Sequence, residues 1–267
     1  MPVDNSIYDR PGDLWWGDDS PLAAIRTALN PGRLEYLGRV SASLGIDLRG
    51  KTVLDLGCGG GLLAEELGRL GGRVTGIDPA EASLAVARDH AVSGGLEIEY
   101  LAGSGEALPL PDASFDIVCC CDVLEHVDDL EKVISETSRA LKPGGLYLYD
   151  TINRTLRSRL VLVKLLQEWS WTTIMPQDLH DWHQFIRPSE LVSSLGRHGL
   201  RSLGYTGLQP AAGPLALLRF LRQQKRGRLT AVELGERAVM KLSRDTSILY
   251  IGHAVKDGGL SRPVPRS

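Results

Sequence analysis

A glycine-rich turn and a carboxylate that follows it are residues whose types and spacing suit ligand binding. Gly57, Gly59 and Gly60 belong to a run of small residues directly after the apolar stretch 52–56. Glycines let a ligand lie against the backbone and allow the φ values of a tight turn. Asp78 comes about 20 residues later, where a carboxylate can accept hydrogen bonds from both hydroxyls of a ribose. The pattern suits a nucleoside or a dinucleotide, whereas Asp78 could also cap the next helix.

Two acidic residues and a histidine form a second group that could do chemistry. Asp122, Glu125 and His126 are spaced i, i+3 and i+4, so on a helix they would share one face and could hold a divalent cation together. Magnesium prefers oxygen ligands, which counts against the histidine. In the alternative interpretation Asp122 caps a helix, Glu125 is exposed, and His126 packs in the core or meets a substrate.

These groups need a parallel sheet to bring them together. From residue 51 onward, β-rich apolar stretches alternate with segments of helical period, which is typical of a doubly wound α/β domain. The expected strands are 52–56, 73–77, 97–101, 116–121, 146–151, 201–207 and 247–255. The expected helices are 62–70, 79–92, 130–141 and 188–198, with further helical segments at 214–223 and 230–243. Because ligands gather at the carboxyl ends of such strands, Asp78 and His126 are expected at one edge of the sheet.

Composition excludes several classes of protein. Lys and Arg total 30 against 33 for Asp and Glu, and a net charge of -3 gives no reason to expect nucleic-acid binding. No apolar run approaches the roughly 20 residues that span a bilayer, and no secretory signal begins the chain, so the cytoplasm is the expected location. Cys119, Cys120 and Cys121 lie in an expected strand, a spacing that suits neither a disulfide framework nor a zinc site.

Three further motifs, taken with the glycine turn, resemble those of class I S-adenosylmethionine-dependent methyltransferases. They lie at 103–116, 122–127 and 141–145. The resemblance implies a Rossmann-like, mostly parallel seven-stranded sheet whose last strand runs antiparallel. It also implies that S-adenosylmethionine binds across the glycine turn, with its ribose on the carboxylate that follows. One departure is that Ser104 and Gly105 stand where this family often has an acidic residue near the adenine amine, so backbone groups or Ser104 would recognise adenine.

Beyond this core the chain resembles one branch, the ubiquinone-biosynthesis O-methyltransferases. The residues that carry this resemblance are, in order, Trp15-Trp16, Asn30 to Leu34, Asp122 with Leu124 to Val127, Asn153-Arg154, His180-Asp181 and Phe185 to Pro188. That family methylates a hydroxyl on a polyprenylated catechol-like ring. Together the motifs imply donor-binding roles for Arg33, Asp55, Gly57, Gly59, Asp78, Ser104, Gly105, Glu106 and Cys121. For Arg33 the chemistry agrees, since a guanidinium fork suits the carboxylate of the donor. Its alternative is a solvated surface residue.

The resemblance also suggests how the acceptor is activated. Methyl transfer from a sulfonium is an in-line displacement, so the enzyme must hold the acceptor oxygen behind the methyl group and remove its proton. A phenol with a pKa of about 10 needs a base or an adjacent cation to become a good nucleophile near neutral pH. The candidates are His126 and His180, with Asp181 beside the latter, although each histidine could instead serve only as a structural hydrogen-bonding residue. Eukaryotic members of the family bind magnesium at a matching set, which implies Mg²⁺ at Asp122, Glu125 and His126.

The expected organisation is one domain with additions. Its segments are leader helices over the site at 1–50, a methyltransferase domain at 51–256, acceptor-side insertions at about 154–186 and 208–246, and a disordered tail at 257–267. Segments 156–174 and 215–228 combine apolar and basic residues. Each could lie on a membrane surface, or pack on the domain or on a partner copy. Both a monomer and a homodimer remain open.

The expected function is transfer of a methyl group from S-adenosylmethionine to a hydroxyl of an aromatic, catechol-like or quinone-precursor small molecule. One alternative is methylation at O, N or C in a secondary-metabolite pathway. A donor-binding scaffold without catalysis and an NAD-dependent oxidoreductase are the others. Product mass spectrometry with a panel of acceptors distinguishes the two methyltransferase interpretations.

Overall fold

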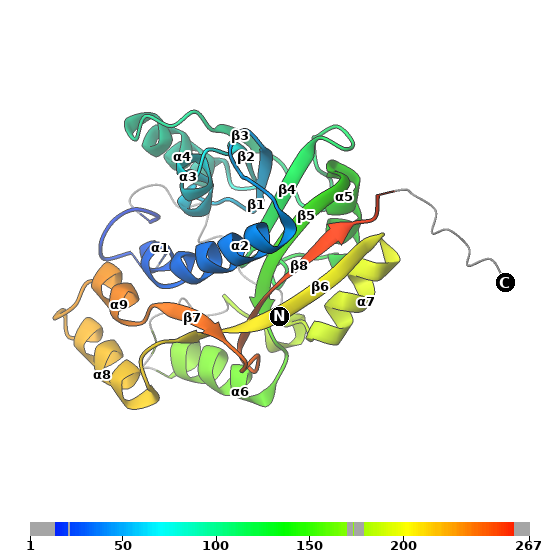
Figure 1. The fold of residues 1–267 in the computed structure, drawn as a ribbon. Helices are drawn as coiled ribbons and strands as arrows, with labels where there is room; N and C mark the ends of the chain where they lie inside the picture. Colours follow the sequence, from blue (N-terminus) through cyan, green and yellow to red (C-terminus); the bar gives the residue numbers. More distant parts are fainter. Residues whose placement is uncertain (1–13, 21, 170–172, 174–178, 259–267) are drawn as a thin grey trace.

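A single sheet runs through the residues that the computed structural model describes (Figure 1). These residues are 14–20, 22–169, 173 and 179–258. Parts of the expected leader, of the segment 156–174 and of the tail therefore lie outside the described residues, namely 1–13, 21, 170–172, 174–178 and 259–267. Within the described ranges, no helix is long and apolar enough to cross a membrane.

The sheet combines a parallel half with an antiparallel half. Its strands are β1 (Thr52–Leu56), β2 (Arg73–Asp78), β3 (Glu99–Ala102), β4 (Phe115–Cys121), β5 (Leu141–Ile152), β6 (Leu200–Pro210), β7 (Met240–Ser243) and β8 (Leu249–Lys256). Their order is β3-β2-β1-β4-β5-β8-β6-β7. Strands β1 to β5 pair in parallel, whereas β8 lies antiparallel between β5 and β6.

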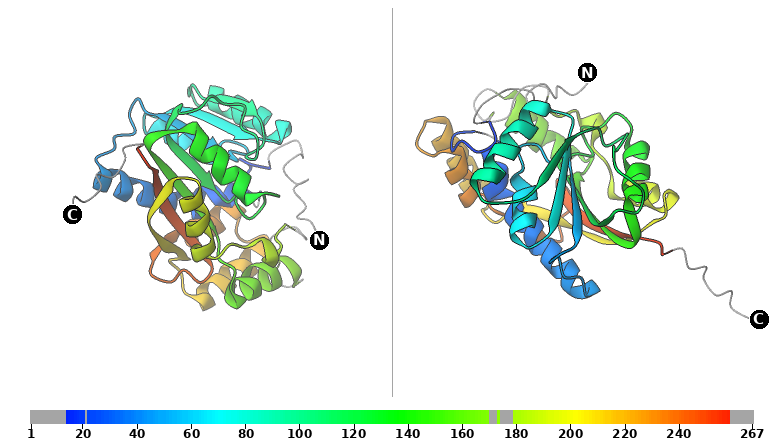
Figure 2. Two further views of the ribbon diagram at one scale, coloured as in Figure 1. Left: turned by 90° about the vertical axis from the view of Figure 1, so that its right-hand side faces the viewer. Right: turned by 90° about the horizontal axis from the view of Figure 1, so that it is seen from above.

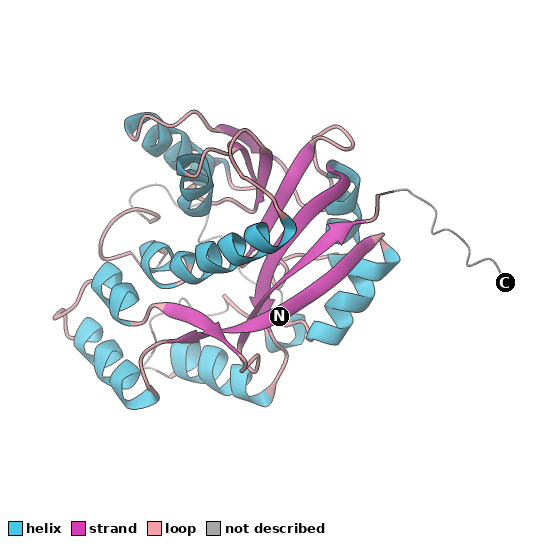
Figure 3. Ribbon diagram, in the orientation of Figure 1, coloured by secondary structure: helices cyan, strands magenta, loops and turns pink. Residues whose placement is uncertain are grey.

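Helices cover both faces of this sheet (Figures 2 and 3). They are α1 (Ala23–Ala28), α2 (Asn30–Leu44), α3 (Leu62–Arg69), α4 (Glu81–Ser93), α5 (Leu130–Ala140), α6 (Leu156–Ser158), the π-helix η2 (Arg159–Glu168), the 3-10 helix η3 (Trp182–Gln184), α7 (Pro188–Arg197), α8 (Pro214–Lys225) and α9 (Ala231–Arg237). Leu37, Leu67 and Leu84, from α2, α3 and α4, belong to one apolar core. Ile134 and Leu191, from α5 and α7, belong to another. Because successive strand side chains point to opposite faces, the same strands contribute to both cores.

The fold class predicted from the sequence is confirmed, but the sheet has eight strands in the described residues and not seven. The predicted helix 230–243 is wrong in its second half. Helix α9 ends at Arg237, and β7 pairs antiparallel with β6, from Gly207 opposite Ser243 to Pro210 opposite Met240. Periodicity alone cannot assign such a short apolar run to helix or strand. Here the backbone groups at the edge of the long strand β6 decide, because they offer hydrogen bonds to a further strand.

The register of the sheet brings several strand ends to one edge. Leu56 pairs with Ile77 in β2 and with Cys120 in β4, and Cys121 pairs with Asp150 in β5. The residues that follow β1, β2 and β4 therefore lie beside one another. This is the ligand-binding edge expected of a doubly wound sheet.

Helix α2 of the leader packs on the antiparallel half of the sheet. Pro31 lies in its first turn, and Gly45 ends it with a φ of 67°, a left-handed conformation that glycine adopts easily. The hydroxyl of Tyr36 lies 2.9 Å from His253 Nδ1 on β8. This packing places the first turn of α2, with Arg33, at the ligand-binding edge.

Candidate active site

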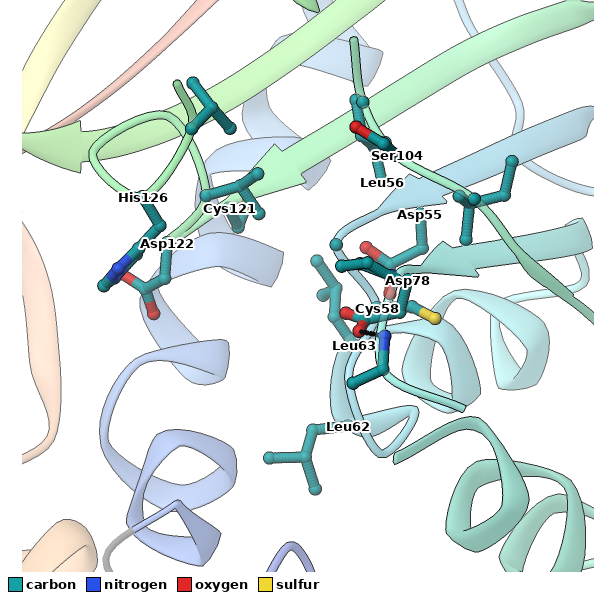
Figure 4. A pocket seen from close by; sticks show the side chains of 18 of the residues that line it. Asp55, Leu56, Cys58, Leu62, Leu63, Asp78, Ser104, Cys121, Asp122 and His126 are labelled. Atoms are coloured by element: carbon teal, nitrogen blue, oxygen red, sulfur yellow. Dashed lines mark hydrogen bonds between the residues drawn. The ribbon is translucent and has the colours of Figure 1, made fainter. Parts of the chain in front are cut away.

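A cavity of about 450 Å³ opens at the ligand-binding edge (Figure 4). Small-molecule sites commonly occupy about 300–1,000 Å³, so the volume suits a ligand of nucleoside size. The residues predicted to bind the donor that line this cavity are Arg33, Asp55, Gly57, Asp78, Ser104, Gly105, Glu106 and Cys121. Two of the predicted catalytic and metal-binding residues, Asp122 and His126, line it as well.

The glycine turn between β1 and α3 packs against protein side chains. Gly57, Gly59 and Gly61 have φ values of 73°, 50° and 85°, in the left-handed region that favours glycine. A Cβ on Gly57 would lie 2.2 Å from Val123 Cγ2, and one on Gly59 would lie 2.2 Å from the ring of Trp15. The turn therefore needs glycine for its own packing, in addition to the close approach of a ligand that the sequence suggested.

The Asp78 carboxylate joins the glycine turn to α4. Its Oδ2 accepts a hydrogen bond from Gly59 N–H at 2.9 Å, and its Oδ1 accepts one from Ala80 N–H at 2.9 Å. The N-cap position of α4 is Ala80, so Asp78 is not the capping residue of that helix. A carboxylate has further acceptor positions, and Asp78 can use them for the hydroxyls of a ribose in the cavity.

Asp55, at the end of β1, presents a buried acceptor at the cavity. Its Oδ2 has no hydrogen-bond partner among the described residues. Burial raises the pKa of Asp55 to about 7, and the positive charge of Arg33 opposes this rise. Because a buried polar atom without a partner is unfavourable, this oxygen fits a ligand that supplies a donor such as an ammonium group.

Arg33 is held by aspartates at the ends of β4 and β5. Its Nε and Nη2 donate to the two oxygens of Asp150 at 2.6 and 3.1 Å, and Nη2 also donates to Asp122 Oδ2 at 2.5 Å. Nη1 donates to Asn30 Oδ1 at 3.2 Å. Although burial opposes the charge, Asp122 and Asp150 raise the pKa of Arg33 well above its usual value. Arg33 is 3 % exposed, so the alternative of a solvated surface residue is wrong. A donor carboxylate would meet Arg33 through Nη1 or in place of Asp122.

Asp150 and Trp15 are among the residues of this site that were not predicted from the sequence. Asp150 is fully buried at the end of the strand that contains it. An acid inside an apolar run could have indicated it, because a buried carboxylate needs a partner. Trp15 lines the cavity from the leader. Nothing local indicates that residue 15 reaches the glycine turn, so only the folded chain shows it.

Asp122, Glu125 and His126 do not share a helical face. They lie in the connection between β4 and α5, where Asp122 has a φ of 56°. Asp122 pairs with Arg33, while Glu125 is buried and its Oε2 accepts a hydrogen bond from Thr151 Oγ1 at 2.7 Å. In the ranges that the structure describes, no three His, Cys, Asp or Glu side chains are placed to hold a metal ion together. The helical premise is therefore wrong, and these side chains do not fit a magnesium site.

The two candidate bases lie side by side. The ring centroids of His126 and His180 are 5.3 Å apart, with 43° between the ring planes. Gln167 fixes His180, because its side chain accepts from the His180 N–H at 2.9 Å and donates to the His180 carbonyl at 3.2 Å. Burial lowers the pKa of each histidine to about 4, so both rings are neutral at pH 7. Asp181 accepts a hydrogen bond from His183 N–H at 2.9 Å and caps η3, so its carboxylate serves local structure.

Comparison with known proteins agrees with this arrangement. Residues 54–149 match a family model described as a methyltransferase domain. The chain is 39% identical over 222 residues to the ubiquinone biosynthesis O-methyltransferase of Methylocella silvestris, which covers 78% of this chain and 84% of that one. It is 40% identical over 208 residues to the protein of the same name from Nitrosococcus oceani, with 78% and 85% covered. The chain belongs to the ubiquinone biosynthesis O-methyltransferase family.

Membership confirms the expected activity of an S-adenosylmethionine-dependent O-methyltransferase. Solved structures of lower identity share the fold of this O-methyltransferase. The structure of magnesium protoporphyrin IX methyltransferase from Synechocystis contains bound SAH (S-adenosylhomocysteine, the demethylated donor). It superposes with a TM-score of 0.55 at 19% identity over 84% of this chain and 82% of that one. A SAM-dependent methyltransferase from Aquifex aeolicus superposes with a TM-score of 0.54 at 16% identity over 89% and 94%.

Proposed function

We propose that this O-methyltransferase moves a methyl group from S-adenosylmethionine to a hydroxyl of a catechol-like quinone precursor. The names of its relatives support the acceptor class. The observation that carries the proposal is one cavity that joins the strand-end carboxylates Asp55 and Asp78 to His126. A donor on the carboxylates and an acceptor beside the histidine would share the same space, as direct methyl transfer requires.

The cavity offers different chemistry to each part of the donor. Asp78 would accept hydrogen bonds from the ribose hydroxyls, and the buried Oδ2 of Asp55 would accept one from the ammonium group. Arg33 would bind the carboxylate. Ser104 and Glu106 are hydrogen-bonded to each other just after β3 and line the cavity, which supplies polar groups for the adenine. Backbone groups beside Ser104 would complete that end of the site.

The transfer itself is an in-line displacement. The acceptor oxygen attacks the methyl carbon, the oxygen–carbon bond forms as the sulfur–carbon bond breaks, and the donor leaves as a neutral thioether. The hydroxyl proton passes to His126, which lines the cavity and is neutral at pH 7. Because the pKa of His126 is about 4, it cannot ionise a phenol in advance, so the proton leaves as the new bond forms. His180 packs against His126 and would position its ring.

The histidine roles can be tested by comparing three alanine variants. His126→Ala is expected to keep the donor dissociation constant and to lower kcat by about 100-fold or more, because it removes the general base. His180→Ala should lower kcat by a smaller factor. His183→Ala, at an exposed position three residues after His180, should leave kcat unchanged. Calorimetry with SAH and product mass spectrometry with catechol acceptors supply the two measurements. Full activity in His126→Ala would remove the base assignment.

The acceptor class needs its own test. We expect methylated product from catechols, with a polyprenyl side chain lowering KM, because the relatives are named for ubiquinone biosynthesis. Amines and carbon acceptors from secondary metabolism serve as the comparison in the same panel. Preferential methylation of those compounds would replace the quinone precursor as the proposed acceptor.

We also infer that the protein works at the cytoplasmic surface of a membrane. Leu156 on α6 is 76% exposed, and Leu215 at the start of α8 is 85% exposed. Arg222 lies in the last turn of α8. Exposed apolar side chains beside basic ones suit an anionic lipid surface. Leu156→Glu with Leu215→Glu should therefore reduce co-sedimentation with phosphatidylglycerol vesicles. Equal recovery of the wild type and the variant with these vesicles would contradict the inference.

A further inference from the structure

The segment before α1 lies directly on the glycine turn. A Cβ on Gly59 would lie 2.2 Å from Trp15 Cη2, and one on Gly60 would lie 2.1 Å from Trp15 Cγ. The indole therefore spans both glycines and rests on their backbone. Trp15 is 7% exposed and lines the same cavity as Asp78. An aromatic side chain of the leader thus forms a wall of the cavity at the point where the domain itself presents bare backbone.

Contacts on both sides fix this position. Trp15 Nε1 donates to the buried Ser83 Oγ on α4 at 2.9 Å, and Trp16 Nε1 donates to the carbonyl oxygen of Gly60 at 2.9 Å. Trp16 also stacks on His90 of α4, with ring centroids 3.4 Å apart and 6° between the planes. The two indoles therefore attach the leader to the glycine turn and to α4 at once.

The ring of His90, on which Trp16 stacks, is itself held in place by neighbouring side chains. His90 Nδ1 lies 2.6 Å from Oε1 of the fully buried Glu65 on α3. Arg69 Nη2 donates to the other oxygen of Glu65 at 2.7 Å. Arg26 of α1 lies over the ring of Trp16, with its guanidinium carbon 5.4 Å from the ring centroid. These contacts hold the ring of His90 in the orientation in which Trp16 stacks on it.

We propose that Trp15 is a donor-binding residue, whose ring, packed on the glycine turn, covers the bound donor and slows its release. The inference rests on the donor site assigned under the proposed function. The cavity is present with Trp15 in place, so the indole bounds the space of the donor and does not fill it. A donor lying along Asp55 and Asp78 would be covered by this ring. Large aromatic side chains bury much surface at little loss of conformational freedom, which suits a ring that covers a bound ligand.

The test compares the binding of S-adenosylmethionine and SAH by the full chain and its variants. Trp15→Ala should weaken binding about 10-fold or more, mainly through faster dissociation, because a buried aromatic contact is lost. Trp15→Phe keeps a ring and should retain most of the affinity. Ser83→Ala, which removes the hydroxyl that accepts the hydrogen bond from Trp15 Nε1, should fall between the wild type and Trp15→Ala. The control Val92→Ala removes an exposed apolar group on α4 and should bind as the wild type does.

Stopped-flow dissociation and calorimetry give the rate and the affinity, and thermal unfolding shows whether each variant is folded. Hydrogen exchange of residues 14–20 should slow when SAH is bound. If the wild type binds donor and Trp15→Ala releases it at the wild-type rate, this inference is overturned while the proposed function stands. If Trp15→Ala is unfolded, a wild-type dissociation rate in Ser83→Ala overturns it. Absence of donor binding in the wild type would overturn the proposed function itself.

Discussion

At the scale of single residues, Arg33 shows how a buried side chain can organise a ligand edge. The bidentate contact with Asp150 fixes the plane of its guanidinium, since the fork matches a carboxylate. Asp122, which lines the cavity, accepts a hydrogen bond from Nη2 of the same guanidinium. Arg33, Asp122 and Asp150 therefore form a cluster of charged groups beside the place where the donor carboxylate is expected. Removing one of the two aspartates would leave the buried charge of Arg33 only partly compensated.

Asp150→Ala should reduce both stability and donor affinity. The free energy of unfolding is expected to fall by about 3 kcal/mol, because the Arg33 charge would remain buried with half of its partners gone. Urea unfolding followed by circular dichroism measures the change. Asp47→Ala removes the exposed ion pair with Arg49 and is the matched control, with no measurable loss expected. A loss in Asp150→Ala no larger than that of the control would show that the buried pair does not stabilise the fold.

At the scale of elements, the glycine turn depends on a segment far away in the sequence. The carbonyl oxygen of Gly60 accepts a hydrogen bond from Trp16, and the ring of Trp15 packs on Gly59 and Gly60. The N–H of Gly59 donates to Asp78. The conformations of the turn follow from local chemistry, because glycine alone adopts them easily. The close approach of Trp15 is a tertiary requirement that happens to select the same residue type. Glycine is thus required in this turn for two reasons, the backbone conformation of the turn and the close packing of Trp15 from the leader.

Gly60→Ala separates these two requirements. Gly60 is not among the residues of positive φ, so the added Cβ acts through its clash with Trp15. We expect weaker donor binding and a lower melting temperature. The control is Gly38→Ala on α2, where a Cβ meets nothing within 4 Å and should stabilise the helix by about 0.5–1 kcal/mol. In a Trp15→Ala background, Gly60→Ala should cause a much smaller loss, and full additivity of the two changes would contradict this interpretation.

At the scale of the whole molecule, the two ends of the parallel strands have separate tasks. The carboxyl ends form the cavity, whereas the amino ends are joined by Asp116, whose Oδ2 accepts hydrogen bonds from Thr52 N–H, Thr52 Oγ1 and Lys142 Nζ at 2.8–2.9 Å. Partial burial raises the pKa of Asp116, but the bonds from Lys142 and Thr52 outweigh this and lower it to about 2. This group ties β1, β4 and β5 together away from the ligand.

Asp116→Asn should therefore reduce stability without changing donor binding. The folded pKa of about 2 lies below the ordinary value, so the carboxylate stabilises the fold above about pH 4, and this contribution is lost as the pH falls toward 2. At pH 7 we expect a loss of about 1–2 kcal/mol, reduced from the full linkage value because the group is partly exposed. Urea unfolding between pH 2 and about 7 should show that the free energy of unfolding depends less steeply on pH in the variant than in the wild type. An unchanged slope would contradict the assignment, and an altered affinity for SAH would contradict the separation of the two edges.

Much of the site could be predicted because its signals are local. The strand-turn-helix pattern around Gly57, the carboxylate Asp78 at the next strand end and the position of His126 follow from periodicity and from the residues beside them. The face assigned to Asp122 and Glu125 was wrong, because helical spacing was assumed in a connection that contains a left-handed residue. Spacing indicates a shared face only where the backbone is helical.

Most of the strands and helices and the glycine turn can be predicted from the sequence, since each depends on residue types within a few positions of one another, and the family follows from motifs along the chain. Only the tertiary structure decided which distant groups meet: Trp15 on the turn, Arg33 between Asp122 and Asp150, and His126 beside His180. Such contacts join segments far apart in the chain. They arise from the packing of helices on a sheet whose strand order does not follow the sequence, and local periodicity carries no information about that packing.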